Sequence, residues 1–219
     1  GHDLRTPLSA LQYGVELLGS ESTDPATLGI LQRMRRGVGR MSVLVDDLVD
    51  FTRGRLGGGI ALDVRDEHAL ELHFMQVIGE LREVHPEAHI VELIQPGINL
   101  RCDPGRLSQL LSNLVKNAIV HGNPGTEVNV FVTCTEDRFF MSVANEGEPL
   151  PAHVVSQLFK PFWRSPSSKA QEGLGLGLYI VSEIARSHGG TLDVSSQGGK
   201  VCFAFTMPVS PAVAGSAVA

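Results

Sequence analysis

Hydrophobic residues in the first fifty positions recur at alternating steps of four and three. Two series have this spacing: Leu4, Leu8, Leu11, Val15 and Leu18, then Leu31, Met34, Val38, Met41, Val45 and Leu48. The spacing predicts two amphipathic helices whose apolar seams have coiled-coil character. Between them, Ser20 to Ala26 predicts a turn, in which Asp24 caps the second helix and Pro25 takes its first position.

A hairpin of two such helices has little hydrophobic core of its own. A second copy packed against the seams would form a four-helix bundle and cover them. The seams therefore predict a homodimer. Packing of the two helices on the rest of the same chain is the alternative that the sequence leaves open.

The periodicity stops near residue 53, where the sequence TRGRLGGG is rich in glycine and arginine. Such a composition favours a flexible linker between domains. The predicted organisation is a helical hairpin over residues 1–53, a linker over 54–59 and a second domain over 60–208. Residues 209–219, rich in Ala, Val, Gly and Ser, are expected to be a disordered tail.

The second domain has the pattern of strands interleaved with helices. Helices are predicted at residues 66–84, 104–121, 152–158 and 176–188. Strands are predicted at residues 60–64, 89–94, 98–102, 127–135, 138–145, 191–195 and 201–207. This order, with a hairpin at Glu136 and Asp137, predicts an α+β fold in which helices pack on one face of a sheet.

Composition narrows the class of protein. The chain has 219 residues, 42% of them hydrophobic, and no apolar run reaches the roughly 20 residues that a membrane helix requires. No signal peptide is visible and the three cysteines form no CxxC pair, so we expect a soluble chain with reduced thiols, suited to the cytoplasm. The net charge of -6 argues against nucleic acid as a partner. A chain that begins inside a motif is expected to be part of a longer protein, and any membrane segment would then precede it.

The chain opens with GHDLRTPLSA, which places ionisable residues at the start of the first helix. In the heptad that contains Leu4, His2 falls on the solvent side, with Asp3 beside it and Thr6 one turn along. Pro7 removes a backbone hydrogen bond and is expected to bend this turn. Taken alone, the His2 and Asp3 pair is most simply interpreted as a solvated surface histidine beside an acid.

The stretch LLSNLVKNAIVHG carries polar residues on an apolar helix. Asn113, Asn117 and His121 recur every four residues and so share one helix face. Amide oxygens are hard ligands suited to Mg2+, whose coordination is usually completed by water and substrate phosphates. An exposed polar stripe is the alternative interpretation of this stretch by itself.

The stretch EGLGLGLYIV alternates glycine and leucine directly before a helix. Gly173, Gly175 and Gly177 would let backbone amides approach an anion, and the helix N-terminus would face a phosphate. A glycine-rich packing turn is the alternative, because a short glycine pattern is weak evidence by itself.

The stretch NEGEPLP follows a predicted strand, where Asn145 and Gly147 would form the floor of a small-molecule pocket. The polar segment from Ser165 to Glu172 predicts a mobile lid that leads into the glycines. Three aromatic residues before it are expected to be core or lid anchors: Phe159, Phe162 and Trp163.

Taken in order, these stretches resemble the sensor histidine kinases of two-component signalling, whose ATP-binding fold is shared with DNA gyrase, Hsp90 and MutL. HDLRTPL matches the H box, NLVKNA the N box, NEG the first glycine box, LFKPFWR the F box and GLGLGL the second glycine box. The resemblance covers nearly the whole chain, and five boxes in the right order are far more specific than any one of them. The form NEGEPLP is similar to that of bacteriophytochrome-type kinases.

The resemblance implies a helical hairpin that dimerises as a four-helix bundle, followed by an α/β-sandwich ATP-binding domain of the gyrase, Hsp90 and histidine kinase type. It implies that His2 accepts the phosphoryl group of ATP and passes it to an aspartate of a response regulator receiver domain. Asp3 would fix the tautomer of His2 and raise its nucleophilicity. Thr6 corresponds to a position that helps related kinases to orient water for dephosphorylation of the response regulator.

In the ATP-binding domain, the resemblance implies that Asn117 binds Mg2+ with support from Asn113. It also implies that Gly173, Gly175 and Gly177 form the loop that contacts the phosphates of ATP. The implied activity is that of an ATP-dependent protein histidine kinase.

Two positions depart from the family pattern. Asn145 stands where related kinases usually have the aspartate that accepts a hydrogen bond from the adenine amino group, although an amide oxygen is also an acceptor. Val120 stands where many relatives have lysine, which leaves His121, Lys116 and Arg164 to meet the phosphates.

Because of Asn145, a non-catalytic phosphotransfer or scaffold protein with a degenerate pocket stays open as the alternative function. A gyrase-like or Hsp90-like ATPase is less favoured, because neither needs a histidine and aspartate pair on a helical hairpin.

Overall fold

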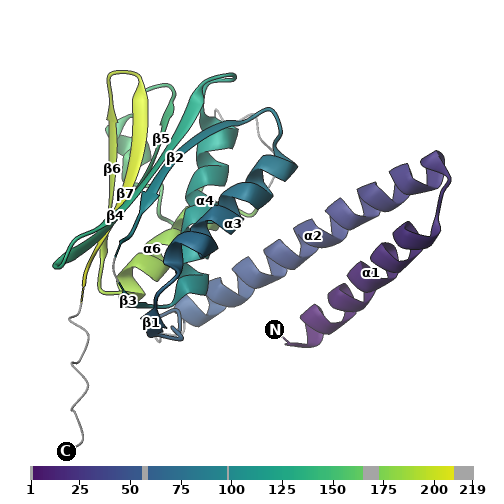
Figure 1. Cartoon of the computed structure of the whole chain (residues 1–219). Helices are drawn as coiled ribbons and strands as arrows, with labels where there is room; N and C mark the ends of the chain where they lie inside the picture. Colours follow the sequence, from purple (N-terminus) through teal and green to yellow (C-terminus); the bar gives the residue numbers. More distant parts are fainter. Residues whose placement is uncertain (1, 56–58, 98, 165–172, 210–219) are drawn as a thin grey trace, which may run out of the picture. The chain divides into compact units, whose positions relative to one another are not determined.

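A computed structural model describes the chain except for residues 1, 56–58, 98, 165–172 and 210–219, and except for the side chains of residues 2–4. The chain divides into two compact units, residues 1–57 and residues 58–219. The first contains two helices, and the second contains the strands and the remaining helices (Figure 1). The domain limits given above from the sequence stay predictions.

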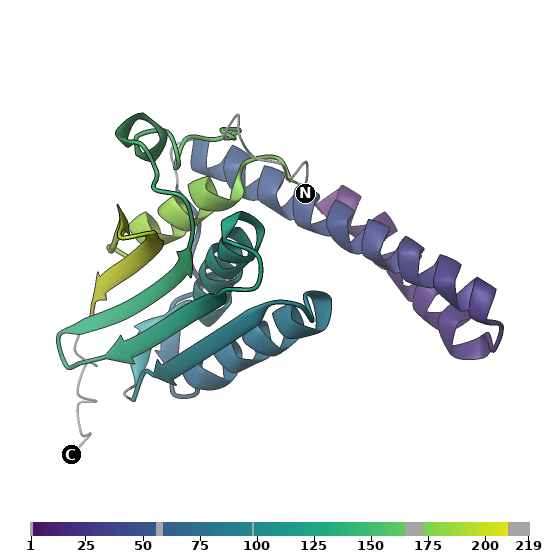
Figure 2. The same cartoon turned by 90° about the horizontal axis from the view of Figure 1, so that it is seen from above.

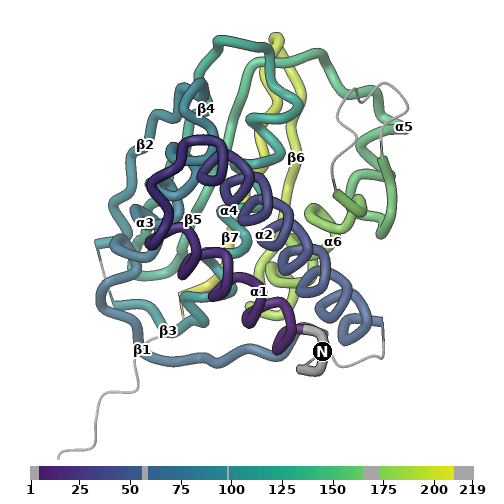
Figure 3. The backbone as a smooth tube through the Cα atoms, turned by 90° about the vertical axis from the view of Figure 1, so that its right-hand side faces the viewer, coloured from purple at the N-terminus to yellow at the C-terminus, as the bar shows by residue number. Residues whose placement is uncertain are grey.

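The first unit is a helical hairpin, as predicted. Helix α1 (His2–Glu21) continues through Pro7, and helix α2 (Pro25–Arg53) runs back beside it (Figure 3). Asp24 caps α2, because its carboxylate accepts a hydrogen bond from the backbone N–H of Thr27 at 2.9 Å. The turn signals read from the sequence therefore have the structural roles predicted for them.

The two helices of the hairpin cover each other only in part. Val15, Leu31 and Val38 are buried, and Arg5 pairs with Asp46 at 2.7 Å. Other members of the two apolar series are largely exposed: Leu11 (52%), Leu18 (56%), Met34, Met41 and Leu48. The hairpin thus leaves an apolar seam that its own two helices do not cover.

The second unit is built on a five-stranded sheet with the order β2-β4-β5-β7-β6. β2 is parallel to β4, and the other neighbours are antiparallel. The strands are β2 (His89–Gln95), β4 (Glu127–Cys134), β5 (Arg138–Glu146), β6 (Thr191–Gln197) and β7 (Lys200–Pro208). A second, two-stranded sheet pairs β1 (Arg65–Glu67) with β3 (Leu100–Cys102).

Helices α3, α4 and α6 lie on one face of the five-stranded sheet, as Figures 1 and 2 show. The helices are α3 (Leu70–Val84), α4 (Pro104–His121), α5 (Ala152–Val155) and α6 (Gly177–Ser187). Phe139 of β5 lies at the centre of the core, with its ring centroid 6.3 Å from that of Phe74 and 6.0 Å from that of Phe205. The predicted α+β architecture with helices on one sheet face is confirmed.

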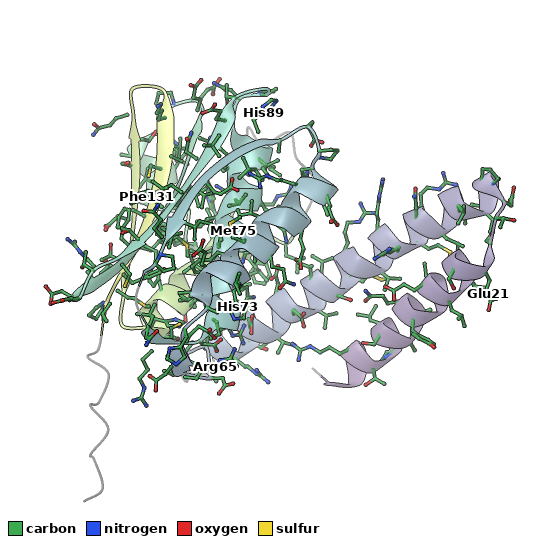
Figure 4. All side chains as sticks on the ribbon, in the orientation of Figure 1. Glu21, Arg65, His73, Met75, His89 and Phe131 are labelled. Carbon is green, nitrogen blue, oxygen red and sulfur yellow. The ribbon has the colours of Figure 1, made fainter. Side chains whose placement is uncertain are left out.

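The first two elements predicted for the second domain are wrong in detail. Residues 60–64 are irregular rather than a strand, and residues 65–67 form β1 rather than the start of a helix. α3 begins only at Leu70, because the Glu67 carboxylate accepts the backbone N–H of Ala69 at 2.9 Å and ends the extended segment there. Arg65 and His73, both labelled in Figure 4, also approach that carboxylate. Together these contacts, with the Ala69 hydrogen bond first, lower the pKa of Glu67.

Elsewhere the predicted elements lie within a few residues of the observed ones. α4 has the predicted limits, whereas α5 ends at Val155 instead of residue 158. Of the predicted aromatic anchors, Phe159 packs edge-on against Phe203 with ring centroids 6.4 Å apart, and Phe162 is exposed. The lid predicted at 165–172 and nearly all of the tail predicted at 209–219 lie outside the described residues.

Candidate functional site

The first part of the site is the polar face of α4. Asn113 and Asn117 are half-buried and His121 is exposed. The helix begins at a capped end, where the Asp103 carboxylate accepts the N–H of Arg106 at 2.9 Å. The rest of the helix is fixed by buried apolar residues: Leu107, Leu110, Leu111, Leu114, Val115 and Ala118. This packing holds the three polar side chains on one helix face.

The second part is Asn145 at the end of β5. Its side chain is buried, with 5% exposure, and its Nδ2 donates a hydrogen bond to the carbonyl oxygen of Glu146 at 2.9 Å. Nδ2 also lies 3.2 Å and 3.3 Å from the positions that a Cβ would take on Gly122 and Gly147. Among the described residues no donor to its Oδ1 is found, so this oxygen is the atom of Asn145 that is left to accept a hydrogen bond from a ligand.

Gly122 has a structural role that the sequence did not reveal. A Cβ at this position would lie 2.6 Å from the carbonyl oxygen of Ala118, closer than atoms approach without a shift in the backbone. The glycine therefore lets α4 end directly against Asn145. A glycine after a helix is a known stop signal, but that signal does not show which residue of another element the glycine packs against.

The loop after α4 and the end of β5 are joined by backbone hydrogen bonds. Asn123 donates its N–H to the carbonyl of Glu146 at 2.8 Å, and Gly147 donates to Gly199 at 3.0 Å. The carbonyl oxygen of His121 lies 3.6 Å from the Cβ position of Gly147. The structure thus brings His121, Asn145 and Gly147 together, as the prediction of one shared pocket requires.

A cavity of about 360 Å³ lies beside this junction and is lined by Asn123, Glu146, Gly147, Glu148, Gly198, Gly199 and Lys200. Gly147 is the one predicted site residue in its lining. The cavity therefore lies beside the candidate site and is not the predicted nucleotide pocket.

The third part is the glycine segment before α6. Gly173 and Gly175 have φ values of +91° and +70°, which side chains other than glycine rarely adopt. A Cβ on Gly175 would also lie 2.7 Å from the carbonyl oxygen of Trp163. Both features demand glycine in this segment, and at Gly175 the missing side chain lets the backbone pack closely against Trp163.

The glycine segment meets α4 where α6 begins. Asn113 donates a hydrogen bond from Nδ2 to the carbonyl oxygen of Gly177 at 3.5 Å, and its Cγ lies 3.9 Å from the Cβ position of that glycine. The N-terminus of α6 is therefore next to the polar face of α4. This arrangement suits an anion.

The imidazole of His121 is close to Arg164. Loss of hydration around the ring, and after it the positive charge of Arg164, lower the pKa of His121 below its ordinary value. These effects favour the neutral form of His121, and Arg164 supplies a positive charge at this end of α4. The sequence analysis named both residues among those expected to contact the phosphates of ATP.

The predicted phosphoacceptor residues belong to the first unit. His2 and Asp3 lie in the first turn of α1, but their side chains are outside the described part of the structure. Thr6 is exposed on the same helix. The roles of these three residues stay predictions.

Two family models match the chain. Residues 102–211 match the model described as "Histidine kinase-, DNA gyrase B-, and HSP90-like ATPase", and residues 1–57 match "His Kinase A (phospho-acceptor) domain". The chain belongs to the histidine kinase family. The resemblance seen in the five sequence boxes is therefore confirmed.

Curated relatives of the chain are longer than it is. It is 34% identical to a bacteriophytochrome of Pseudomonas aeruginosa over 99% of this chain and 30% of the relative. It is 32% identical to the sensor histidine kinase TrcS of Mycobacterium tuberculosis over 95% of this chain and 42% of that protein. This histidine kinase chain thus spans less than half the length of these relatives.

Solved histidine kinases have the same fold. Full-length ShkA, in a crystal structure in complex with AMPPNP, matches with a TM-score of 0.72 and 26% identity over 96% of this chain and 45% of that chain. The histidine kinase AdeS of Acinetobacter baumannii matches with a TM-score of 0.63 and 23% identity over 96% of this chain and 98% of that chain. Among the described residues, no helix is long and apolar enough to cross a membrane.

Proposed function

We propose that the chain is the catalytic core of a protein histidine kinase that transfers the γ-phosphoryl group of ATP to His2 and then to an aspartate of a response regulator. The observation that carries this proposal is the contact of Asn113 with Gly177. It puts the polar face of α4 beside the glycine-rich start of α6, within a chain whose first residues match a phosphoacceptor domain. In the first transfer, the bond from the γ-phosphorus to the bridging oxygen of ADP breaks, and a bond from phosphorus to a ring nitrogen of His2 forms.

Asn145 recognises adenine in this proposal. Its Nδ2 is held by the Glu146 carbonyl, so its Oδ1 accepts a hydrogen bond from the adenine amino group. Gly122 and Gly147 leave room around the amide because a side chain at either position would approach Nδ2. Recognition of the base therefore depends on a neutral acceptor in place of a carboxylate.

The phosphates of ATP are held between α4 and α6. The N–H groups at the start of α6 and in the segment of Gly173 and Gly175 donate to phosphate oxygens, and Arg164 adds a positive charge. Loss of hydration and the charge of Arg164 lower the pKa of His121, and its ring N–H can donate a hydrogen bond to a phosphate oxygen.

The donor set of α4 fits Mg2+ better than a transition metal. Among the described residues, no group of three or more His, Cys, Asp or Glu side chains could hold a metal ion. Asn117 offers an amide oxygen on the face that Asn113 shares, and Mg2+ is commonly held by one or two protein oxygens together with phosphates and water. When bound, Mg2+ neutralises the charge that develops on the β- and γ-phosphate oxygens. Asn117 would hold it, and Asn113 would support that position.

His2 is the nucleophile in this proposal. Asp3 accepts a hydrogen bond from one ring nitrogen, which leaves the other nitrogen unprotonated and able to attack phosphorus. Thr6 orients water when the phosphorylated response regulator is hydrolysed. The linker over residues 54–59 allows the ATP-binding unit to move toward His2.

The partners that we infer are a second copy and a receiver domain. The exposed seam of the hairpin and the match to the phosphoacceptor domain support a homodimer through a four-helix bundle. ThkA, which has the same fold at 21% identity and a TM-score of 0.61, was solved in complex with the response regulator protein TrrA. A response regulator is the expected recipient of the phosphoryl group here, on the strength of the family to which the chain belongs. We expect no nucleic-acid partner, because the net charge of the chain is -6 and nucleic-acid binding requires a basic surface.

A non-catalytic phosphotransfer or scaffold protein is the second candidate function, and Asn145 is the observation that favours it. The neutral amide lacks the charge that strengthens a hydrogen bond to adenine. If this loss abolished nucleotide binding, the hairpin would still receive phosphate from another protein.

Incubation with γ-labelled ATP and Mg2+ tests the proposed function. The label should be retained in base and lost in acid, as phosphohistidine is, and it should depend on Mg2+. Absence of label in a chain that binds ATP would contradict the kinase proposal, and absence of both label and ATP binding would favour the scaffold.

A further inference from the structure

The segment that leads into the second unit, residues 59–63, is fixed to the ends of two helices. We call it the leading segment. Ile60 is buried, with 4% exposure, and the N–H of Asp63 donates to Oδ2 of Asp103 at 2.8 Å. The Cβ position of Gly59 lies 3.3 Å from Oγ of Ser187, at the C-terminus of α6. The leading segment is therefore held by the start of α4 and the end of α6.

Asp103 uses its carboxylate for two purposes. Oδ1 caps α4 by accepting the N–H of Arg106, and Oδ2 accepts the N–H of Asp63. The residue is buried, so both hydrogen bonds are shielded from water. Because each oxygen has its own partner, a side chain with a single oxygen could cap α4 but could not also hold Asp63.

His188 joins the other helix to the same point. Its Nδ1 lies 2.9 Å from the carbonyl oxygen of Ile184, which only accepts, so Nδ1 carries the proton. Nε2 is then unprotonated and accepts the backbone N–H of Asp103 at 3.3 Å. Hydrogen bonding thus fixes one tautomer of His188, and that tautomer links the C-terminus of α6 to the cap of α4.

The helices α4 and α6 run antiparallel between this point and the nucleotide site. Asp103 faces His188 at one end, and Asn113 faces Gly177 at the other. Asn113 is ten positions after Asp103 along α4, a rise of about 15 Å. The apolar residues between the two ends are fully buried: Leu107, Leu110, Leu111, Ile180 and Ile184. A well-packed helix pair of this kind moves as one body.

We propose that Asp103 and His188 form a clamp that fixes the leading segment to the helix pair, and thereby sets the position from which bound ATP is delivered to His2. Both are positioning residues, because neither contacts the residues assigned to the nucleotide. The proposal rests on the proposed kinase function. Breaking the clamp would loosen the leading segment, through which the linker joins the ATP-binding unit. Phosphoryl transfer to His2 should then be slower, whereas nucleotide affinity should stay the same because the nucleotide site is intact.

Two substitutions of His188 separate the two hydrogen bonds of its ring. In His188→Asn, the amide nitrogen takes the place of Nδ1 and no acceptor remains for Asp103. In His188→Gln, the amide oxygen takes the place of Nε2 and can accept the N–H of Asp103. Asp103→Ser is a second way to open the clamp, since serine is also a good N-cap but has one side-chain oxygen and so releases Asp63.

The test uses the full chain, with three readouts. At saturating Mg2+ and ATP, we expect His188→Asn and Asp103→Ser to lower the single-turnover rate of autophosphorylation by about tenfold, because small misplacements of reacting groups are costly. Calorimetric affinity for ADP should stay within about twofold of wild type. Hydrogen exchange of the Asp63 amide should accelerate by about fivefold or more, as loss of a hydrogen bond worth about 1 kcal/mol implies. His188→Gln should be close to wild type in all three.

The proposal is overturned if His188→Asn and His188→Gln have the same rate, or if ADP affinity falls together with the rate. It is also overturned if the Asp63 amide exchanges alike in wild type and His188→Asn. Should His188→Asn fail to fold, Asp103→Ser decides the question with the same readouts. If wild type binds ADP but is not labelled, the proposed kinase function fails instead, and exchange at Asp63 alone then shows whether the clamp exists.

Discussion

Asn113 and Gly177, far apart in the sequence, meet through a hydrogen bond from Nδ2 of the asparagine to the carbonyl oxygen of the glycine. The contact brings the polar face of α4 to the start of α6, where the positive end of the helix dipole favours an anion. The predicted metal-binding amide of Asn117 lies one helical turn further along that face. A phosphate held by the start of α6 would therefore lie within reach of a metal ion held by α4.

Asn117→Ala removes the proposed metal ligand without touching Asn145. Mg2+-dependent affinity for ATP should fall by about tenfold or more, whereas affinity in EDTA should change little, because the lost group acts through the metal. Calorimetry with and without Mg2+ makes the comparison. Ser112→Ala, on the same helix, is the control and should behave as wild type. Equal Mg2+-dependent affinity in Asn117→Ala and wild type would mean that Asn117 is only part of an exposed polar stripe.

Substitutions of Asn145 distinguish a functional pocket from a degenerate one. Asn145→Asp keeps an acceptor and adds charge, so ATP affinity should hold or rise by up to about tenfold, since a charge-assisted hydrogen bond is about 1 kcal/mol stronger. Asn145→Leu removes the acceptor and should weaken binding by about 1–3 kcal/mol. Titration of ADP and ATP measures both. If wild type fails to bind at millimolar nucleotide and Asn145→Asp binds, the scaffold function is correct.

Gly122→Ala tests the close approach of α4 to Asn145. The new methyl group would lie 2.6 Å from the Ala118 carbonyl and 3.2 Å from Nδ2 of Asn145, so we expect a loss of about 1–3 kcal/mol of unfolding free energy and weaker ADP binding. Gly79→Ala, in the middle of α3 with open space around it, is the matched control and should stabilise the chain by about 0.5–1 kcal/mol. Urea unfolding gives both values. If both variants were equally stabilised, Gly122 would not be crowded.

The stability of the second unit should fall as the solution becomes acidic. Burial lowers the pKa of His188 below its ordinary value of 6.5, although its hydrogen bond to Ile184 and the charge of Asp103 oppose the shift. Below pH 6.5 the unfolded chain therefore binds a proton that the folded chain does not, and the free energy of unfolding decreases with falling pH. His121 contributes in the same direction.

Urea midpoints at pH 7.5 and pH 5.5 measure this dependence, and His188→Gln, which does not titrate, should reduce the difference between them. An unchanged difference would show that His188 does not titrate differently in the folded and unfolded chain.

Local signals in the sequence predicted most of the fold. Asp24 and Pro25 marked the start of α2, and α4 was predicted with its observed limits, because caps and buried periodicity act over a few residues. The start of α3 was predicted wrongly because β1 pairs with β3, a partner more than thirty residues away in the chain.

In the candidate site, too, local motifs were predicted and contacts between distant residues were not. The asparagines of α4 and the glycines before α6 were recognised as separate motifs, and the family resemblance placed them in one site. The approach of Gly122 to Asn145 and the bond between Asp103 and His188 were not predicted, because the residues of these pairs are far apart in the sequence. Such contacts follow from how the helices pack on the sheet, for which one sequence carries no direct signal.

In the proposed reaction, His2 receives the γ-phosphoryl group of ATP. The most direct measurement is peptide mass spectrometry, at alkaline pH, of the chain after incubation with Mg2+ and ATP, beside His2→Gln with its ADP affinity determined by calorimetry. We expect a phosphoryl group on His2 in wild type, none in His2→Gln, and equal ADP affinity in both. A phosphoryl group on another residue, or one that persists in His2→Gln, would show that His2 is not the phosphoacceptor.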